Sequence, residues 1–250
     1  MANIDITKPL LECLKQFKGA PEGDTIKNRE NALEEDFVLL AKKLLYGGHL
    51  VCGNYQIKIQ LVEFYYHEEE AMGNKPRIQD TIVYHRNGRY PGKTVPAFPI
   101  MSLHAHTSGY DITFEDPKSR YRASALIRAF TIKDTDGMYI KWKAKDKGEG
   151  SFELQEKPFY DNRSQYLYYY LNGFQIDGNG NQIQWIPTTD NVNYDTCQLY
   201  RGRRKNVYID ESKTVLDDRQ WAFANTDKEV IITHSNKQKE KYGLKHSEFI

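Results

Sequence analysis

The stretch Ile57-Lys58-Ile59-Gln60-Leu61-Val62-Glu63-Phe64-Tyr65-Tyr66-His67 predicts a β-strand whose apolar face carries a carboxylate. Side chains of a strand alternate between two faces, so regular alternation puts these on one side: Ile57, Ile59, Leu61, Glu63 and Tyr65. A carboxylate that faces a core is costly unless it is paired, hydrogen-bonded or protonated. Groups with displaced pKa values are enriched at functional sites, so Glu63 is the first candidate for chemistry.

The segments around this strand predict a mixed α and β chain. Residues 1–18 and 31–46 have apolar residues at helical spacing, with Asn31 as the N-cap of the second helix. Further strands are predicted over Leu50–Cys52, Thr81–His85, Met101–His106, Ile112–Phe114, Ala123–Ile132, Gln182–Ile186, Leu199–Tyr208 and Glu229–Thr233. A polar stretch, Lys141–Glu149, and then a helix over Arg163–Leu171 complete the pattern.

These elements predict an α+β fold, a single domain with a curved, mostly antiparallel sheet flanked by a few helices. Within residues 1–250 we expect an N-terminal helix and loop in 1–30, a core in 31–233 and a polar C-terminal tail in 234–250.

Composition narrows the function classes. The 35 Lys and Arg residues nearly balance the 34 Asp and Glu residues, which argues against a general polyanion binder but leaves room for a local basic groove. The three cysteines are far apart and predict neither a disulfide framework nor a Cys-built zinc site. The chain starts without a secretory pattern and has no apolar run near the ~18 residues that span a bilayer. We expect a cytoplasmic protein with no membrane contact, no cofactor and no obligate protein partner.

Three histidines lie in the β-rich middle of the chain: His85, His104 and His106. His104 and His106 are two apart in a predicted strand, so both rings point to one side. With Asp111, they offer two imidazoles and a carboxylate to a metal such as iron or zinc. A metal-dependent enzyme is therefore an alternative interpretation, which the short motif favours only weakly.

Arginines give two further candidate sites. Arg128 lies in an otherwise apolar strand, where an ion pair with an acid such as Glu63, Asp111 or Glu115 is favoured over a substrate contact. Basic residues alternate with aromatic ones in Tyr200–Lys205 and Arg219–Phe223, a pattern that suits a nucleic-acid backbone beside a stacking face. The candidates for phosphate contacts are Arg201, Arg203, Arg204 and Arg219, with a solvated basic hairpin as the alternative.

The order of several motifs resembles that of the alkyladenine (3-methyladenine) DNA glycosylases. The segment 36–47 resembles a helix of that family, and Val62–His67 partly matches its V-E-T-E-A-Y motif. Leu126-Ile127-Arg128-Ala129 resembles its L-I-R-A strand end, and Arg219–Phe223 resembles its terminal R-F-Y segment. The similarity spans roughly residues 36–233.

The resemblance implies hydrolysis of the N-glycosidic bond of a modified or damaged base, which is flipped out of DNA for base-excision repair. Glu63 would activate the water and His85 would contact the base. The substrate-binding residues would be Tyr65, Tyr66, His104, His106, Asp111 and Arg128. The catalytic acid of the family falls on Tyr65 and its wedging aromatic on His67, so Glu63 takes the catalytic place only if a one-residue bulge re-aims it. The alternative is a nucleic-acid or small-ligand binding protein without catalysis.

Overall fold

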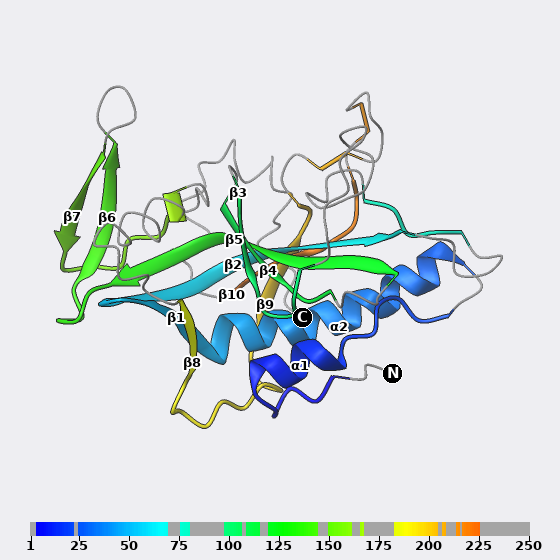
Figure 1. Ribbon diagram of the computed structural model, residues 1–250, viewed down its shortest axis with the longest axis horizontal. Helices are drawn as coiled ribbons and strands as arrows, with labels where there is room; N and C mark the ends of the chain where they lie inside the picture. Colours follow the sequence, from blue (N-terminus) through cyan, green and yellow to red (C-terminus); the bar gives the residue numbers. More distant parts are fainter. Residues whose placement is uncertain are drawn as a thin grey trace.

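The computed structural model describes most of the predicted core (Figure 1). The described residues are 4–22, 25–69, 76–80, 98–106, 109–115, 120–144, 150–161, 166–167, 183–204, 207–208, 214–215 and 217–225. The predicted strands Thr81–His85 and Glu229–Thr233, most of the predicted helix Arg163–Leu171 and the tail 234–250 lie outside them.

Two helices precede the sheet, α1 (Leu10–Gln16) and α2 (Ile26–Tyr46). The prediction that α2 starts after Asn31 is wrong, because Thr25 caps the helix by accepting a 3.2 Å hydrogen bond from the Asn28 amide. The added first turn has no apolar periodicity. It is held instead by Arg29, which is buried and pairs with Glu68.

The described strands form one ten-stranded antiparallel sheet. They are β1 (Gly48–Cys52), β2 (Tyr55–Glu68), β3 (Leu103–His106), β4 (Gly109–Thr113), β5 (Tyr121–Lys133), β6 (Tyr139–Ala144), β7 (Gly150–Gln155), β8 (Gln184–Pro187), β9 (Leu199–Gly202) and β10 (Ala222–Asn225). The main order is β3-β4-β5-β2-β1-β8, while β10 joins β2 to β9 and β6 joins β5 to β7. The predicted α+β fold with a curved antiparallel sheet is confirmed.

The β6–β7 hairpin includes part of Lys141–Glu149, which the sequence indicated as a polar stretch without strands. Ile140 and Trp142 are buried in the core, and the lysines that alternate with them face outward. Lys143 and Glu153 form an exposed cross-strand pair at 3.9 Å. The segment is highly charged, but buried and outward-facing side chains still alternate along it, as is usual for a β-strand.

Both helices cover one face of the sheet, below it in Figure 1. Phe37 of α2 stacks on Phe64 of β2, with ring centroids 4.6 Å apart and planes at 11°. Phe17, just after α1, lies 5.9 Å from Phe37. This aromatic cluster fixes which residues of β2 face the helices. We call the opposite side of the sheet the outer face.

Two neighbouring β-bulges reverse the alternation of the central strands. Ile59 pairs with Phe130, Leu61 with Ala129, and Val62 with Ile127, so Gln60 in β2 and Arg128 in β5 are extra residues. Such a one-residue step exchanges the two faces of a strand. The prediction of one regular apolar face is therefore wrong. Ile57 and Ile59 pack in the helix-side core, as do Val62, Phe64 and Tyr66, whereas Leu61, Glu63 and Tyr65 point to the outer face.

Candidate functional site

A row of directly paired residues crosses the outer face on five neighbouring strands. His104 pairs with Asp111, Asp111 with Leu126, Leu126 with Glu63, and Glu63 with Ala222. Directly opposed residues of antiparallel strands project to the same side, so His104, Asp111 and Glu63 share one face. At strand spacings of about 4.8 Å, the backbones of Asp111 and Glu63 are about 10 Å apart.

Glu63 is fully buried and contacts one side chain of the adjacent strand β5 and one of its own strand. Its Oε2 lies 3.3 Å from Arg128 Nε and accepts a 2.9 Å hydrogen bond from the Tyr65 hydroxyl. Burial raises the pKa of Tyr65 well above its usual range, and the charge of Glu63 raises it further. Tyr65 therefore stays protonated and donates. The predicted ion pair between Arg128 and an acid is confirmed, with Glu63 as that acid.

The other residues of the row have different surroundings. Asp111 is buried, and the half-buried His104 ring lies 4.3 Å from the ring of Phe98. His106 belongs to β3, but its side chain lies outside the described part of the structure, as does all of His85. Within the described part of the chain, no three His, Cys, Asp or Glu side chains gather closely enough to hold a metal ion.

Tyr66 does not join this site, because the bulge turns it toward the helices. Its hydroxyl accepts a 2.8 Å hydrogen bond from the Ala20 amide and lies 3.2 Å from Glu68 Oε1. Glu68 also pairs with Arg29 of α2. Tyr66 thus packs in the helix-side core, on the opposite face from Glu63, so the structure does not bring this predicted substrate-binding residue together with Glu63.

Arg204, a predicted phosphate contact, is a buried structural residue. Its guanidinium pairs with Asp80 and, at 2.8 Å, with Asp217. It lies over the rings of Tyr65 and Trp221, at 4.7 Å and 5.1 Å from their centroids. An arginine that is 2% exposed has no free surface for a nucleic-acid backbone.

Two other arginines of the predicted basic surface are also held by acids. Arg201 pairs with Glu34 of α2, and Arg219 pairs with Asp217 and approaches Glu30 at 3.7 Å. Arg203 is exposed. Of the four arginines predicted to contact phosphates, Arg201, Arg204 and Arg219 are therefore paired with acids of the protein, and Arg203 is the exposed one.

Asp217 is the acid that joins Arg204 to Arg219. Burial by itself would raise the pKa of Asp217, but the hydrogen bond from Arg219 and the charge of Arg204 outweigh it and lower the pKa to about 2. This carboxylate therefore stays charged over the whole physiological pH range.

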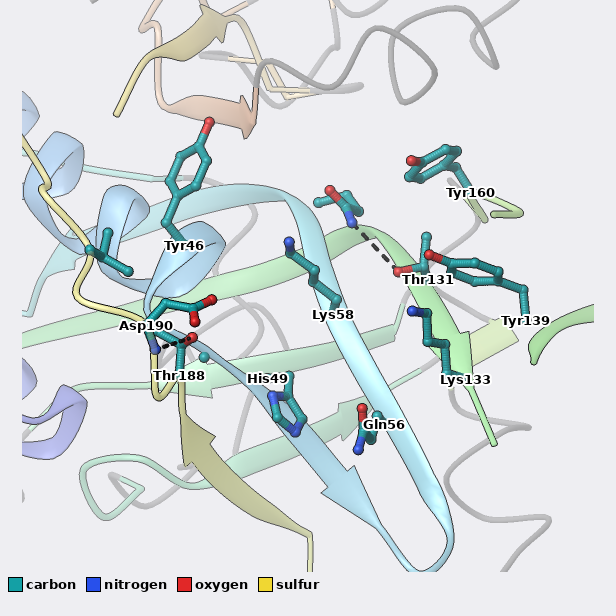
Figure 2. A pocket seen from close by; sticks show the side chains of 13 residues that line it. Tyr46, His49, Gln56, Lys58, Thr131, Lys133, Tyr139, Tyr160, Thr188 and Asp190 are labelled. Atoms are coloured by element: carbon teal, nitrogen blue, oxygen red, sulfur yellow. Dashed lines mark hydrogen bonds between the residues drawn. The ribbon is translucent and has the colours of Figure 1, made fainter. Parts of the chain in front are cut away.

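Sequence reasoning missed a groove of about 470 Å³ on the outer face, over the first half of β2 (Figure 2). Its polar and aromatic lining consists of Tyr46, His49, Gln56, Lys58, Gln60, Thr131, Lys133, Tyr139, Tyr160, Thr188 and Asp190. These residues come from distant parts of the chain and form no linear motif. The available signal was the polar alternation Gln56, Lys58, Gln60 between buried isoleucines.

This α+β protein is thus defined by a buried acid on one half of the outer face and a basic, aromatic groove on the other half. No family model, no curated protein and no solved structure matches the chain. Of the described helices, none is long and apolar enough to cross a membrane.

Proposed function

We propose that the protein hydrolyses the N-glycosidic bond of a modified or damaged base in DNA, with Glu63 as the general base. The observation that carries the proposal is the setting of Glu63, a fully buried carboxylate on the outer face, next to a cation and a phenol donor. A carboxylate fixed in a dry site can take a proton from water and offset positive charge that develops on a sugar.

In this mechanism each partner of Glu63 has a defined task. Water bonds to C1′ of the sugar while the C1′–N bond breaks, and the base leaves with the bonding electron pair. Glu63 takes one proton from the water and later returns it to solvent. The departing base takes up one proton from solvent, so the net reaction consumes one water molecule. The Tyr65 hydroxyl and the Arg128 guanidinium are positioning groups, since both contact Glu63 Oε2. His104 and Asp111 lie in the same row, and in this proposal they contact the flipped base.

The arrangement of three segments that resemble glycosylase motifs supports the proposal. Val62–His67 lies in β2, and Leu126–Ala129 lies in the adjacent β5. The segment Arg219–Phe223 runs into β10, which pairs with β2 on its other side. Segments that are far apart in sequence thus meet at Glu63, and the bulge at Gln60 turns Glu63 to the outer face.

The test is release of a base from alkylated duplex DNA, measured as strand breaks at abasic sites after alkali treatment. We expect wild-type protein to generate abasic sites and Glu63→Gln to be slower by at least about a hundredfold. Glu115→Gln is the matched control, because Glu115 is also buried and accepts a 3.1 Å hydrogen bond from an arginine, Arg122. Equal rates for wild type and Glu63→Gln, or no abasic sites with wild type, would refute the proposal.

A second candidate is DNA or small-ligand binding without hydrolysis. The ion pair with Arg128 favours it, because this contact by itself accounts for the burial of Glu63. Salt-dependent DNA binding without base release would distinguish this candidate from the hydrolase.

A further inference from the structure

The groove on the outer face holds two lysines from neighbouring strands. Lys58 of β2 pairs with Thr131 of β5, and Lys133 of β5 pairs with Gln56 of β2. The two lysines are therefore diagonal neighbours, at backbone separations of about 7–8 Å, and they share one face. Lys58 is exposed and Lys133 is half-buried. Like charges so close repel each other unless an anion lies between them.

The two lysines differ from the arginines described above, because none of the described residues supplies an acid partner for them. No carboxylate of the described residues forms an ion pair with Lys58 or Lys133, in contrast to Arg201, Arg204 and Arg219. The one acid in the lining, Asp190, lies beside Thr188, whose hydroxyl accepts a 3.2 Å hydrogen bond from its amide. Asp190 thus also lines the groove, but within the described part of the chain its carboxylate forms no ion pair with Lys58 or Lys133.

Aromatic side chains surround this charge. In Figure 2 the amino groups of Lys58 and Lys133 lie between Tyr46 on one side and Tyr139 and Tyr160 on the other. Lys133 Nζ lies 4.6 Å from the centroid of the Tyr139 ring. Tyrosine offers a face for stacking and a hydroxyl for hydrogen bonding, and both are useful for a ligand with a planar ring.

The electrostatics of His49 agree with a positive groove. Burial lowers the pKa of His49, and the charge of Lys58 lowers it further. At neutral pH the imidazole is therefore neutral and can both donate and accept hydrogen bonds.

We propose that this groove binds a nucleotide unit. Its phosphate lies between Lys58 and Lys133, and its base lies against the tyrosines that line the groove, Tyr46, Tyr139 and Tyr160. The choice of a nucleotide rests on the proposed function, because the groove and Glu63 lie on the same face of β2. Lys58 and Glu63 are separated along β2 by about 16 Å at the usual rise per residue. A strand of nucleic acid that places a base at Glu63 has its flanking phosphates within reach of the groove.

The experiment measures binding of a short fluorescein-labelled single-stranded DNA by anisotropy and of adenosine monophosphate by calorimetry. We expect Lys58→Gln/Lys133→Gln to weaken binding of the DNA at least about tenfold and to reduce its salt slope by about 0.7, the value for one phosphate of a single strand that is no longer neutralised. Binding of both probes would identify a nucleotide unit as sufficient, and binding of the DNA alone would identify a strand as the ligand.

The control is Lys15→Gln/Lys18→Gln, which removes the same charge from the helix side of the protein. There Lys15 pairs with Glu12 at 2.9 Å, and Lys18 donates to the Lys15 carbonyl at 2.8 Å. This control should bind like wild type. The inference is overturned if wild type binds neither probe, or if the groove variant and wild type bind equally. If wild type shows lysine-dependent binding but releases no base from alkylated DNA, only the catalytic proposal is refuted, and the binding inference stands.

Discussion

Arg128 Nε lies 3.3 Å from Glu63 Oε2, between two strands that pair from Gln56 to Glu68. Arg128 reaches this place because it is the extra residue of β5 at the bulge. Its side chain is 13% exposed and that of Glu63 is 0% exposed, so solvent screens the pair little. The same contact therefore affects both the stability of the sheet and the proposed chemistry.

Removing the cation should destabilise the protein. In Arg128→Gln, Glu63 stays buried without its charged partner, and we expect the free energy of unfolding in urea to fall by about 3–5 kcal/mol. The double variant Glu63→Gln/Arg128→Gln removes both charges, so it should lose less than the sum of the two single variants. Additive losses would show that the two side chains are energetically independent.

Arg204 should be essential for folding rather than for DNA binding. Arg204→Gln leaves Asp80 and Asp217 buried with less compensation, and we expect a loss of about 3–5 kcal/mol in thermal or urea unfolding. Arg203→Gln, at the exposed neighbouring position, should stay within about 0.5 kcal/mol of wild type. An Arg204→Gln protein as stable as wild type would contradict this structural role.

Asp217 should make stability depend on acid pH. Its pKa falls from 3.8 to about 2 on folding, so the unfolded chain binds the proton more readily. The stabilisation, about 2 kcal/mol, is fully present above pH 4–5 and is lost as the pH falls toward 2. Urea unfolding as a function of pH should show this loss in wild type and in the exposed control Asp195→Asn. Asp217→Asn should lack this part of the slope, and an unchanged slope would exclude Asp217 as its source.

The two adjacent tyrosines of β2 should respond differently to loss of the hydroxyl. Tyr66→Phe leaves the Ala20 amide without its acceptor and should cost about 1–3 kcal/mol of stability without affecting base release. Tyr65→Phe removes a donor to Glu63 and should lower the rate of base release and shift its pH profile. Unfolding and abasic-site assays on both variants check this, and the reverse assignment would contradict the inverted faces of β2.

Local patterns in the sequence were sufficient to predict the architecture. The apolar spacing of Leu33, Phe37, Leu40 and Leu44 defines α2, and the apolar runs around Ile57 and Ile127 define the paired central strands. These features depend on residues close together in the chain. The start of α2 was missed because Arg29 is held by Glu68, a contact between segments far apart.

The site was less predictable, since it depends on register. The sequence identifies both Glu63 and Arg128 as candidates, and it favours an ion pair of Arg128 with an acid such as Glu63, Asp111 or Glu115. Only the structure shows that this acid is Glu63. No local signal shows that Gln60 and Arg128 are extra residues, which decides the face of Tyr65 and Tyr66. Nor does a charged residue such as Arg204 reveal, from its neighbours in sequence, that distant acids neutralise it within the protein.

The two bulges compensate for each other in the register of the ladder. Gln60 adds a residue to one strand and Arg128 adds one to the other, so the ladder has the same register before and after them. An evolving sequence that lost only one of the two insertions would slide every later pair by one position. Losing both together would restore a regular ladder, but at the expense of the arginine beside Glu63. The register of the central ladder and the ion pair between Glu63 and Arg128 therefore depend on the same two inserted residues and change together in evolution.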